Sequence, residues 1–391
     1  MSRRLLVVRL DSMGDVLVSG PAIRAVAAAA DHLTLLTGPL GEAAGRLLPG
    51  VDEVLVWSCP WIANPAPQVS PAEVGELVER LVRLRLDEAV ILTSFHQSPL
   101  PTALLLRLAG VPRIVASSED YPGSLLDLRL PVAGDGPEPE RMLATVRSAG
   151  FELPPGDDGK LAVRLPPGAA RLPPEADRLP PEAAWLPPGA TRLPPGAARH
   201  SAMPVSMPES PYLVMHPGVT AAARAYPAER WAETVRLLSE AGWPVLVTGS
   251  KSERELTAGI VAAARAGLPA REGQPPVLDL AGALDLAELA RLLAGAHAVL
   301  VANTGPAHLA AAVGTPVVSL FSPVVPAARW APYGVPVVLL GDQHAACRDT
   351  RRTTCPVPGH PCLTGVEPIT VLRAVEDLIR QQTAPPLAVT G

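Results

Sequence analysis

Short apolar runs alternate with longer amphipathic stretches along both halves of the chain. Short apolar runs predict buried strands, and apolar positions that recur every three to four residues predict helices. The alternation predicts an α/β protein with two doubly wound parallel sheets. The expected strands are Leu5–Leu10, His32–Thr37, Val54–Trp57, Ala89–Thr93, Ile114–Ala116, Tyr212–His216, Pro244–Thr248, Leu278–Leu280, Val299–Ala302 and Val317–Phe321. The expected helices are Val16–Ala30, Pro71–Arg85, Leu100–Ala109, Ala228–Ala241, Glu253–Ala266, Asp285–Ala294 and Pro368–Gln381, the last of which could pack on either half.

A proline-rich repeat separates the two halves. From Arg164 to Arg199 the chain repeats a seven-residue unit, Arg-Leu-Pro-Pro-Gly-Ala-Ala, with variants. Paired prolines remove helix donors and favour extended structure, so this segment is predicted to be a semi-rigid or disordered linker; a docking motif for a proline-recognition domain is the alternative. The predicted organisation is an N-terminal domain (1–158), the linker (159–209), a C-terminal domain (210–345) and a Cys-containing segment with a terminal helix (346–391).

Length and charge narrow the class of protein. The 391 residues exceed one typical core, and the net charge of −5 without a long basic run argues against a nucleic-acid partner. Arg9 and Asp11 end the first apolar stretch well short of a signal-peptide core, so we expect a first strand in a cytoplasmic protein. No run approaches the ~18 apolar residues of a membrane span, so we expect at most peripheral membrane contact.

The most informative segment is a strand-to-helix turn in the second half. An apolar run stops at Asn303-Thr304-Gly305-Pro306 and becomes an alanine-rich helix. The N–H groups and positive end of such a helix suit a phosphate or pyrophosphate, and Pro306 fits the first helical position, where a missing N–H costs nothing. His308, one turn further, could be a buried hydrogen-bonding histidine or could contact a phosphate oxygen.

A second strand-to-helix corner lies near the N-terminus. The strand 5–10 leads into Gly14 and Asp15 ahead of a helical pattern. Asp15 could accept a proton from an incoming hydroxyl, or it could only cap the helix.

Further polar residues follow the first two predicted strands of the second half. Thr220 and Arg224 follow the strand that ends at His216 and could hold a diphosphate, although Arg224 could equally be a solvated surface residue. Glu253, after the next strand, could bind a nucleoside ribose or cap its helix. Neither a Walker A sequence nor a complete Gly-x-Gly-x-x-Gly is present, which argues against a common ATPase or dehydrogenase.

Three cysteines and a histidine gather near the C-terminus. Cys347, Cys355, His360 and Cys362 could hold zinc, but their spacing lacks a short Cys-x-x-Cys knuckle. We therefore expect reduced thiols in an irregular loop and no resident metal, and a cytosolic setting argues against disulfides.

Four motifs together resemble glycosyltransferase family 9, the ADP-heptose:lipopolysaccharide heptosyltransferases. They are Arg9-Leu-Asp-Ser-Met-Gly-Asp-Val16; His216-Pro-Gly with Arg224 and Tyr226-Pro-Ala-Glu-Arg-Trp231; Thr248-Gly with Glu253; and Asn303-Thr-Gly-Pro-Ala-His-Leu-Ala-Ala-Ala-Val-Gly-Thr-Pro316. The resemblance implies a GT-B architecture, in which two Rossmann-like domains face a cleft, here joined by the Pro-rich low-complexity linker. The first domain would bind the acceptor and the second the nucleotide-sugar.

The resemblance also implies residue roles. Asp15 matches the catalytic base, in an acceptor-side loop with Ser12, Met13 and Gly14. Arg224 falls where the family has a basic residue on the donor phosphates, and the family's diphosphate- and sugar-binding turn matches Thr304, Gly305 and His308. Thr220, Glu253 and Asn303 complete the expected donor site, and Asn303 replaces the Asp of many heptosyltransferases, so it can hydrogen-bond sugar hydroxyls but supplies no charge.

The expected function is inverting, metal-independent transfer of a heptose or similar sugar. The donor substrate would be an ADP-sugar, with no cofactor, and the acceptor a lipopolysaccharide-type or other cell-envelope glycan at the inner face of the membrane. Two alternatives stay open: a GT-B-like nucleotide-sugar epimerase, and a non-catalytic nucleotide-sugar-binding scaffold.

Overall fold

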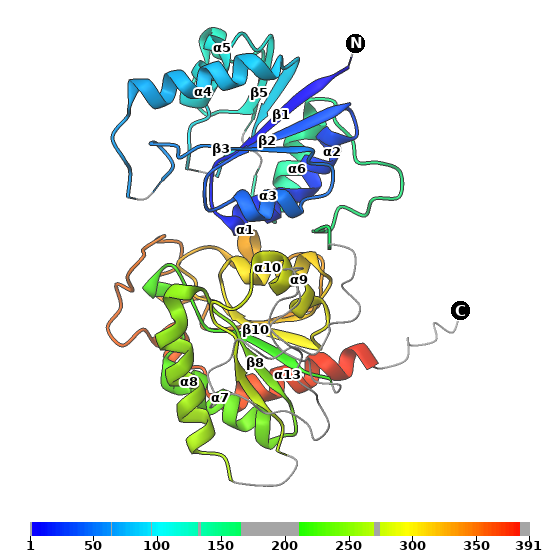
Figure 1. The fold of residues 1–391 in the computed structure, drawn as a ribbon. Helices are drawn as coiled ribbons and strands as arrows, with labels where there is room; N and C mark the ends of the chain where they lie inside the picture. The colour runs from blue at the N-terminus through cyan, green and yellow to red at the C-terminus, as the bar shows by residue number, and fades with distance from the viewer. Residues whose placement is uncertain are drawn as a thin grey trace, which may run out of the picture. The chain divides into compact units, whose positions relative to one another are not determined.

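The chain folds into two α/β units, each built on one six-stranded parallel sheet (Figure 1). The computed structural model describes residues 2–63, 65–94, 96–131, 134–165, 211–269 and 274–383. The first unit comprises Met1–Arg164 with Ala328–Gly334, and the second comprises Leu165–Ala327 with Val335–Gly391. The predicted α/β class with two doubly wound sheets is confirmed.

The first sheet has the strand order β3-β2-β1-β4-β5-β6, with every neighbouring pair parallel. The order reverses between β1 and β4, and ligands of open α/β sheets bind beyond the carboxyl ends of the strands at such a switch point. The strands are β1 (Arg4–Arg9), β2 (His32–Thr37), β3 (Glu53–Val56), β4 (Glu88–Ile91), β5 (Arg113–Ser117) and β6 (Leu128–Leu130).

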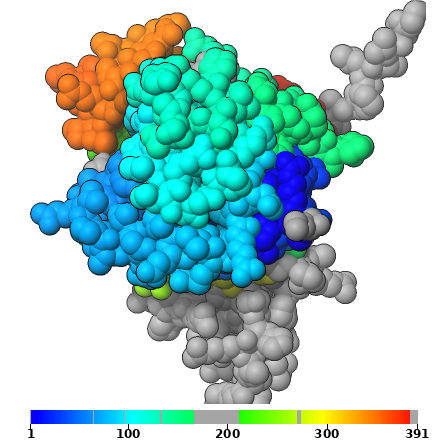
Figure 2. Space-filling model, turned by 90° about the horizontal axis from the view of Figure 1, so that it is seen from above, coloured from blue at the N-terminus to red at the C-terminus, as the bar shows by residue number. Residues whose placement is uncertain are grey.

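One of the helices predicted in the first unit is interrupted. Val16–Ala30 is not one helix, because α1 ends and α2 begins around Ser19. Pro21 has no N–H for the Leu17 carbonyl, so an uninterrupted helix would lose that hydrogen bond. The helices are α1 (Met13–Val18), α2 (Gly20–Ala27), α3 (Glu42–Leu47), α4 (Pro71–Leu84), α5 (Leu100–Leu108) and α6 (Glu138–Ser148), with a 3₁₀ turn, η1 (Gly123–Leu125). Residues of α4 and α5, light blue to cyan, form much of the surface seen in Figure 2.

The second sheet repeats the same topology, with the order β12-β11-β10-β7-β8-β9 and all neighbours parallel. Its switch point lies between β7 and β10. The strands are β7 (Leu213–His216), β8 (Val245–Val247), β9 (Val277–Asp279), β10 (Ala298–Ala302), β11 (Val317–Leu320) and β12 (Val337–Leu340). The edge strands β6 and β12 are additions to the predicted set.

Helices cover both faces of this sheet. α7, α8 and α13 lie on one face, and α9 and α10 on the other (Figure 1). The helices are η3 (Ala222–Arg224), α7 (Ala228–Glu240), η4 (Lys251–Glu253), α8 (Arg254–Ala266), α9 (Leu286–Ala294), α10 (Gly305–Ala312), α11 (Ala327–Trp330), α12 (Pro361–Thr364) and α13 (Pro368–Thr383). The terminal helix therefore packs on the second unit, and the buried Cys347 and Cys362 join the same core. No helix in the described ranges is long and apolar enough to cross a membrane.

Two segments depart from the expected boundaries. Gly159–Arg164 packs on the first unit, since the Arg164 N–H donates to the Leu47 carbonyl at 2.7 Å and Leu161 is buried. The remainder of the predicted linker, from residue 166 on, lies outside the described residues. Ala328–Gly334, inside the predicted C-terminal domain, groups with the first unit, where the Tyr333 hydroxyl donates to Glu140 Oε1 at 3.0 Å.

Candidate functional site

A buried arginine organises the switch point of the first unit. Arg9, the last residue of β1, is fully buried. Its Nη2 lies 3.2 Å from Asp15 Oδ1 and donates to Ser94 Oγ at 2.9 Å, and its Nε lies 3.1 Å from Asp11 Oδ2. Because β1 and β4 are neighbours, residues that follow these two strands meet around one guanidinium.

Asp15 is the third residue of α1 and not, as predicted, the residue before the helix; its carboxylate closes a capping box with the N-cap residue Ser12 and keeps an exposed edge. The Ser12 N–H and hydroxyl donate to Asp15 Oδ2 at 3.3 and 2.6 Å. The side chain of Asp15 retains 21% exposure. Asp15 can therefore accept hydrogen bonds from Ser12 and still be reached by a substrate. Its role as a catalytic base stays a prediction.

Asp11 is a site residue that the sequence did not single out. Burial raises its pKa, against the opposing effect of Arg9, while the neighbouring Asp15 raises it further. Gln97 Nε2 donates to Asp11 Oδ1 at 2.5 Å. The sequence placed Asp11 directly after the first strand and within the first family motif, but assigned it no role.

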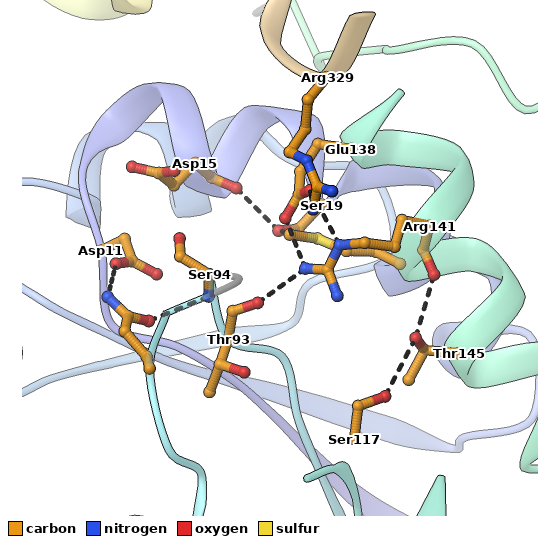
Figure 3. Close-up of polar contacts among 12 residues, drawn as sticks. Asp11, Asp15, Ser19, Thr93, Ser94, Ser117, Glu138, Arg141, Thr145 and Arg329 are labelled. Atoms are coloured by element: carbon orange, nitrogen blue, oxygen red, sulfur yellow. Dashed lines mark hydrogen bonds and ion pairs between the residues drawn. The ribbon is translucent and has the colours of Figure 1, made fainter. Parts of the chain in front are cut away.

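A second charged group, also not predicted, stands behind this loop (Figure 3). Arg141 on α6 donates from Nε and Nη2 to both carboxylate oxygens of the fully buried Glu138, at 2.9 and 2.5 Å, and from Nη2 to the Thr93 carbonyl at 2.8 Å. Arg329, from the segment 328–334 that belongs to this unit, places Nη1 3.8 Å from Glu138 Oε2. Two guanidinium groups thus neutralise Glu138, and Arg141 also holds the Thr93 carbonyl, after β4, in place.

In the second unit, the strand ends carry the predicted donor-site groups. His216 ends β7, and its Nδ1 lies 3.1 Å from Thr248 Oγ1 while Nε2 lies 3.8 Å from Glu253 Oε2. Burial lowers the pKa of His216 to about 4, although Glu253 opposes the shift. The imidazole is therefore neutral at pH 7. Gly218 permits this packing, because a Cβ there would lie 2.0 Å from Glu253 Oε1.

The turn between β10 and α10 has the predicted form. Thr304 occupies the N-cap position of α10 without a side-chain cap hydrogen bond, and Pro306 is the second residue of the helix, where the missing N–H costs no helix hydrogen bond. Asn303 is buried, its Nδ2 donates to the Ser322 carbonyl at 3.4 Å, and its Oδ1 has no hydrogen-bond partner among the described residues. Arg224 Nη1 donates to the Asn303 carbonyl at 3.4 Å. The structure therefore brings Arg224 to the start of α10, and Arg224 is not a solvated surface residue.

The other predicted donor-site residues have different surroundings. His308 is buried in the first turn of α10, Gly305 is half-buried, and Thr220 is exposed on the loop after β7. Glu253 accepts from the Ser250 N–H at 2.7 Å. Glu253 thus closes a capping box on the 3₁₀ turn η4, whereas its side chain makes no cap hydrogen bond to α8, and the carboxylate is still 22% exposed.

The C-terminal cysteines belong to the packing of the second unit. Burial raises the pKa of Cys362 to about 11, with the neighbouring Cys347 adding to the shift. His360 Nε2 lies 3.1 Å from the Ala223 carbonyl. Within the described ranges, no group of three or more His, Cys, Asp or Glu side chains is arranged to hold a metal ion. The zinc alternative for Cys347, Cys355, His360 and Cys362 gains no support.

Two parallel doubly wound sheets, each with polar groups at its switch point, define this chain as an α/β protein of GT-B fold. Residues 192–360 match the model of glycosyltransferase family 9 (heptosyltransferase). Lipopolysaccharide heptosyltransferase 1 of Pseudomonas aeruginosa is 38% identical over 153 residues, which are 38% of this chain and 38% of that protein. The predicted resemblance to glycosyltransferase family 9 is thereby confirmed over residues 192–360.

Solved structures agree on the fold over nearly the whole chain. A family 9 glycosyl transferase from Veillonella parvula has a TM-score of 0.71 at 16% identity, covering 97% of this chain and 98% of that chain. The heptosyltransferase WaaC of E. coli, with ADP-2-deoxy-2-fluoro heptose, has a TM-score of 0.63 at 21% identity, covering 96% of this chain and 99% of that chain. By contrast, the match to the Pseudomonas protein spans little more than a third of that relative's length.

Proposed function

We propose that this protein transfers a heptose, or a closely similar sugar, from an ADP-sugar to a hydroxyl of a lipopolysaccharide-type or other cell-envelope glycan. The observation that carries the proposal is the convergence of Arg224, Asn303 and the N-terminus of α10 at the switch point of the second sheet. The Pseudomonas heptosyltransferase match and the ADP-heptose analogue in the E. coli WaaC structure support the choice of donor.

The donor's diphosphate would lie at the start of α10. The first N–H groups of a helix have no partner within the helix and point toward an anion. Arg224 adds a full positive charge beside them. As the sugar–oxygen bond breaks, negative charge grows on the diphosphate, so these groups stabilise the transition state more than the bound donor. Arg224 and the helix N-terminus thus supply the positive potential that a metal-independent transferase requires at its leaving group.

The acceptor hydroxyl would lose its proton to Asp15. Its oxygen then forms a bond to the anomeric carbon, on the face opposite the departing ADP, so the sugar's configuration inverts. Asp15 gains the proton and ADP leaves with the bonding electron pair. The ion pair with Arg9 and the contacts from Ser12 hold Asp15 in one orientation for this step. We place the protein in the cytoplasm, with at most peripheral contact at the inner face of the membrane, where such acceptors are accessible.

Isothermal titration with ADP-heptose, ADP-glucose, UDP-glucose and GDP-mannose tests the donor. We expect selective binding of ADP-heptose, weakened in Arg224→Ala, because a hydrogen bond to a charged group contributes about 1.5–3 kcal/mol. Arg236→Ala is the matched control, since Arg236 pairs with Glu233 and Glu240 of its own helix, α7. Selective binding of another nucleotide-sugar would overturn the heptose assignment. Binding of none of them would favour the scaffold alternative, and an epimerised donor formed without acceptor would identify an epimerase.

A further inference from the structure

The carboxylate of Asp11 is held by groups that can only donate hydrogen bonds. Its Oδ2 lies 3.1 Å from Arg9 Nε, and its Oδ1 accepts from Gln97 Nε2 at 2.5 Å. Neither a guanidinium nor an amide NH₂ group can accept, so a proton on either oxygen of Asp11 would face a donor. Burial raises the pKa of Asp11, and the contacts with Arg9 and Gln97 oppose this effect and favour the ionised form.

Gln97 has one amide orientation that satisfies both of its contacts. Its Oε1 accepts from the Ser94 N–H at 3.0 Å, while its Nε2 donates to Asp11. With the amide reversed, its NH₂ group would face a backbone N–H and its oxygen would face a carboxylate. The Ser94 hydroxyl in turn accepts from Arg9 Nη2 at 2.9 Å. Arg9, Asp11, Gln97 and Ser94 thus form a closed ring of polar contacts, the Arg9 ring, which joins the chain after β1 to the chain after β4.

Asp15 contacts the same guanidinium from outside the Arg9 ring. Asp11, Asp15 and Ser94, which all contact Arg9, lie side by side in Figure 3. The side chain of Asp15 is 21% exposed and that of Asp11 is 10% exposed. The proposed reaction protonates Asp15 and leaves Asp11 unchanged. If Asp15 were the sole partner of Arg9, its protonation would leave a fully buried guanidinium without a counter-ion, which is strongly unfavourable.

The other charges that face this region are matched. Glu138, on α6, is bound by Arg141 and Arg329, and Arg329 Nη2 also lies 3.2 Å from Asp135 Oδ1. His96 is exposed beside the Arg9 ring and carries a charge only when it is protonated. Among the described residues, the region thus contains three guanidinium groups and four carboxylates: Arg9, Arg141 and Arg329, with Asp11, Asp15, Glu138 and Asp135. One proton on Asp15 makes this set neutral and leaves no arginine unmatched.

We propose that Asp11, held in place by Gln97, is the standing counter-ion of Arg9, so that Asp15 can take up and release a proton while Arg9 stays neutralised. Asp11 and Gln97 are then positioning residues, because they act on the reaction through Arg9. That Asp15 is the base rests on the proposed function. The sharing of Arg9 between two carboxylates does not.

A carboxyl titration of the full chain tests the charge sharing without any substrate. With ¹³C in the aspartate side chains, the signals of Asp11 and Asp15 are identified by their loss in Asp11→Asn and Asp15→Asn. In Asp11→Asn, Arg9 pairs with Asp15 alone, so Asp15 should take up its proton at a pH lower by roughly one unit than in the unaltered protein. Asp158→Asn is the control, because it removes an exposed carboxylate that pairs with Lys160. An Asp15 signal that titrates identically in Asp11→Asn and in the unaltered protein would overturn the inference.

A second variant tests the hold of Gln97 on Asp11. Gln97→Met keeps every charge and removes the amide donor, so Asp11 should take up its proton at a higher pH than in the unaltered protein. This variant also tests the Arg9 ring if Asp11→Asn is too unstable to titrate. An unchanged Asp11 titration in Gln97→Met would show that Gln97 does not hold the ionised carboxylate.

Transfer from ADP-heptose to heptose-free lipopolysaccharide tests the effect on the reaction. Asp11→Asn should lower kcat roughly three- to tenfold, leave the KM for ADP-heptose unchanged and move the acid limb of the kcat profile to lower pH, as expected when the base binds its proton less readily. A lower kcat with an unmoved acid limb would make Asp11 a purely structural residue and would contradict the inference. Absence of transfer in the unaltered protein would contradict the proposed function instead, and the carboxyl titration would still decide whether Arg9 is shared.

Discussion

Arg9 Nη2 lies 3.2 Å from Asp15 Oδ1, and the arginine that makes this contact is completely buried. A fully desolvated guanidinium needs compensating charge, and Asp11 and Asp15 both supply it. The pair therefore serves two purposes: it allows Arg9 to be buried at the end of β1, and it fixes the partly exposed carboxylate of Asp15.

Replacing Arg9 by Met should destabilise the first unit strongly. The change leaves Asp11 and Asp15 without their shared cation, and breaking a buried ion pair costs about 3–5 kcal/mol. Urea unfolding followed by circular dichroism measures the loss. Adding Asp11→Asn to Arg9→Met should recover part of it, because one uncompensated charge is then removed. A double variant no more stable than Arg9→Met would contradict the assignment of Asp11 as a charge partner.

Asp15→Asn should abolish most sugar transfer without affecting the donor site. Loss of a general base lowers kcat by roughly 10²–10⁴-fold, whereas ADP affinity in the second unit should be unchanged. Ser12→Ala is the control, because it removes the hydroxyl contact to Asp15 Oδ2 and leaves the carboxylate in place. If Asp15→Asn kept the kcat of Ser12→Ala, the role of Asp15 would be structural.

The sequence predicted more of the fold than of the candidate site. The turn at Asn303 and Thr304 was predictable, because the end of an apolar run and a helix start are local signals. The Glu138 group was not, since Arg329 is 191 residues away along the chain and a buried Glu beside an Arg has no distinctive sequence pattern. The sequence pattern likewise assigned the segment 328–334 to the C-terminal domain, whereas the structure groups it with the first unit. Its position depends on contacts with residues far away in the sequence, such as that of Tyr333 with Glu140.

Gly218→Ala should weaken nucleotide binding through Glu253. A Cβ at residue 218 would lie 2.0 Å from Glu253 Oε1, so the carboxylate must turn away. If Glu253 binds the ribose, titration should show ADP affinity about tenfold lower in both Gly218→Ala and Glu253→Ala, consistent with a charge-assisted hydrogen bond. The lost cap on the Ser250 N–H alone would cost about 1 kcal/mol of stability. Unchanged ADP affinity in both variants would mean that Glu253 only caps its helix.

Thiol reactivity should identify Cys355 as the accessible cysteine. Cys59, Cys347 and Cys362 are buried, and burial raises the pKa of Cys59 to about 12 and that of Cys362 to about 11. Because the thiolate is the reactive form, Ellman's reagent at pH 8 should label about one thiol quickly and all four after unfolding. Cys355→Ser should remove the fast phase. Two or more fast thiols in the native protein would contradict the buried positions of the other three cysteines.

The neutral His216 should make the second unit less stable in mild acid. Its pKa falls from the ordinary 6.5 to about 4 in the folded protein, chiefly through burial. Between these two values the unfolded chain binds a proton that the folded chain does not, so stability is retained above about pH 6.5 and decreases as the pH falls toward 4. A shift of this size corresponds to a loss of folding stability on the order of 3 kcal/mol.

The variant His216→Gln tests this prediction, because its side chain can still hydrogen-bond Thr248 but does not titrate. Urea unfolding at pH 7 and pH 4.5 should therefore show a smaller pH dependence of stability in the variant. Other carboxylates protonate equally in both proteins, so the difference between them isolates His216, and an identical pH dependence would show that its imidazole is already solvated in the folded state.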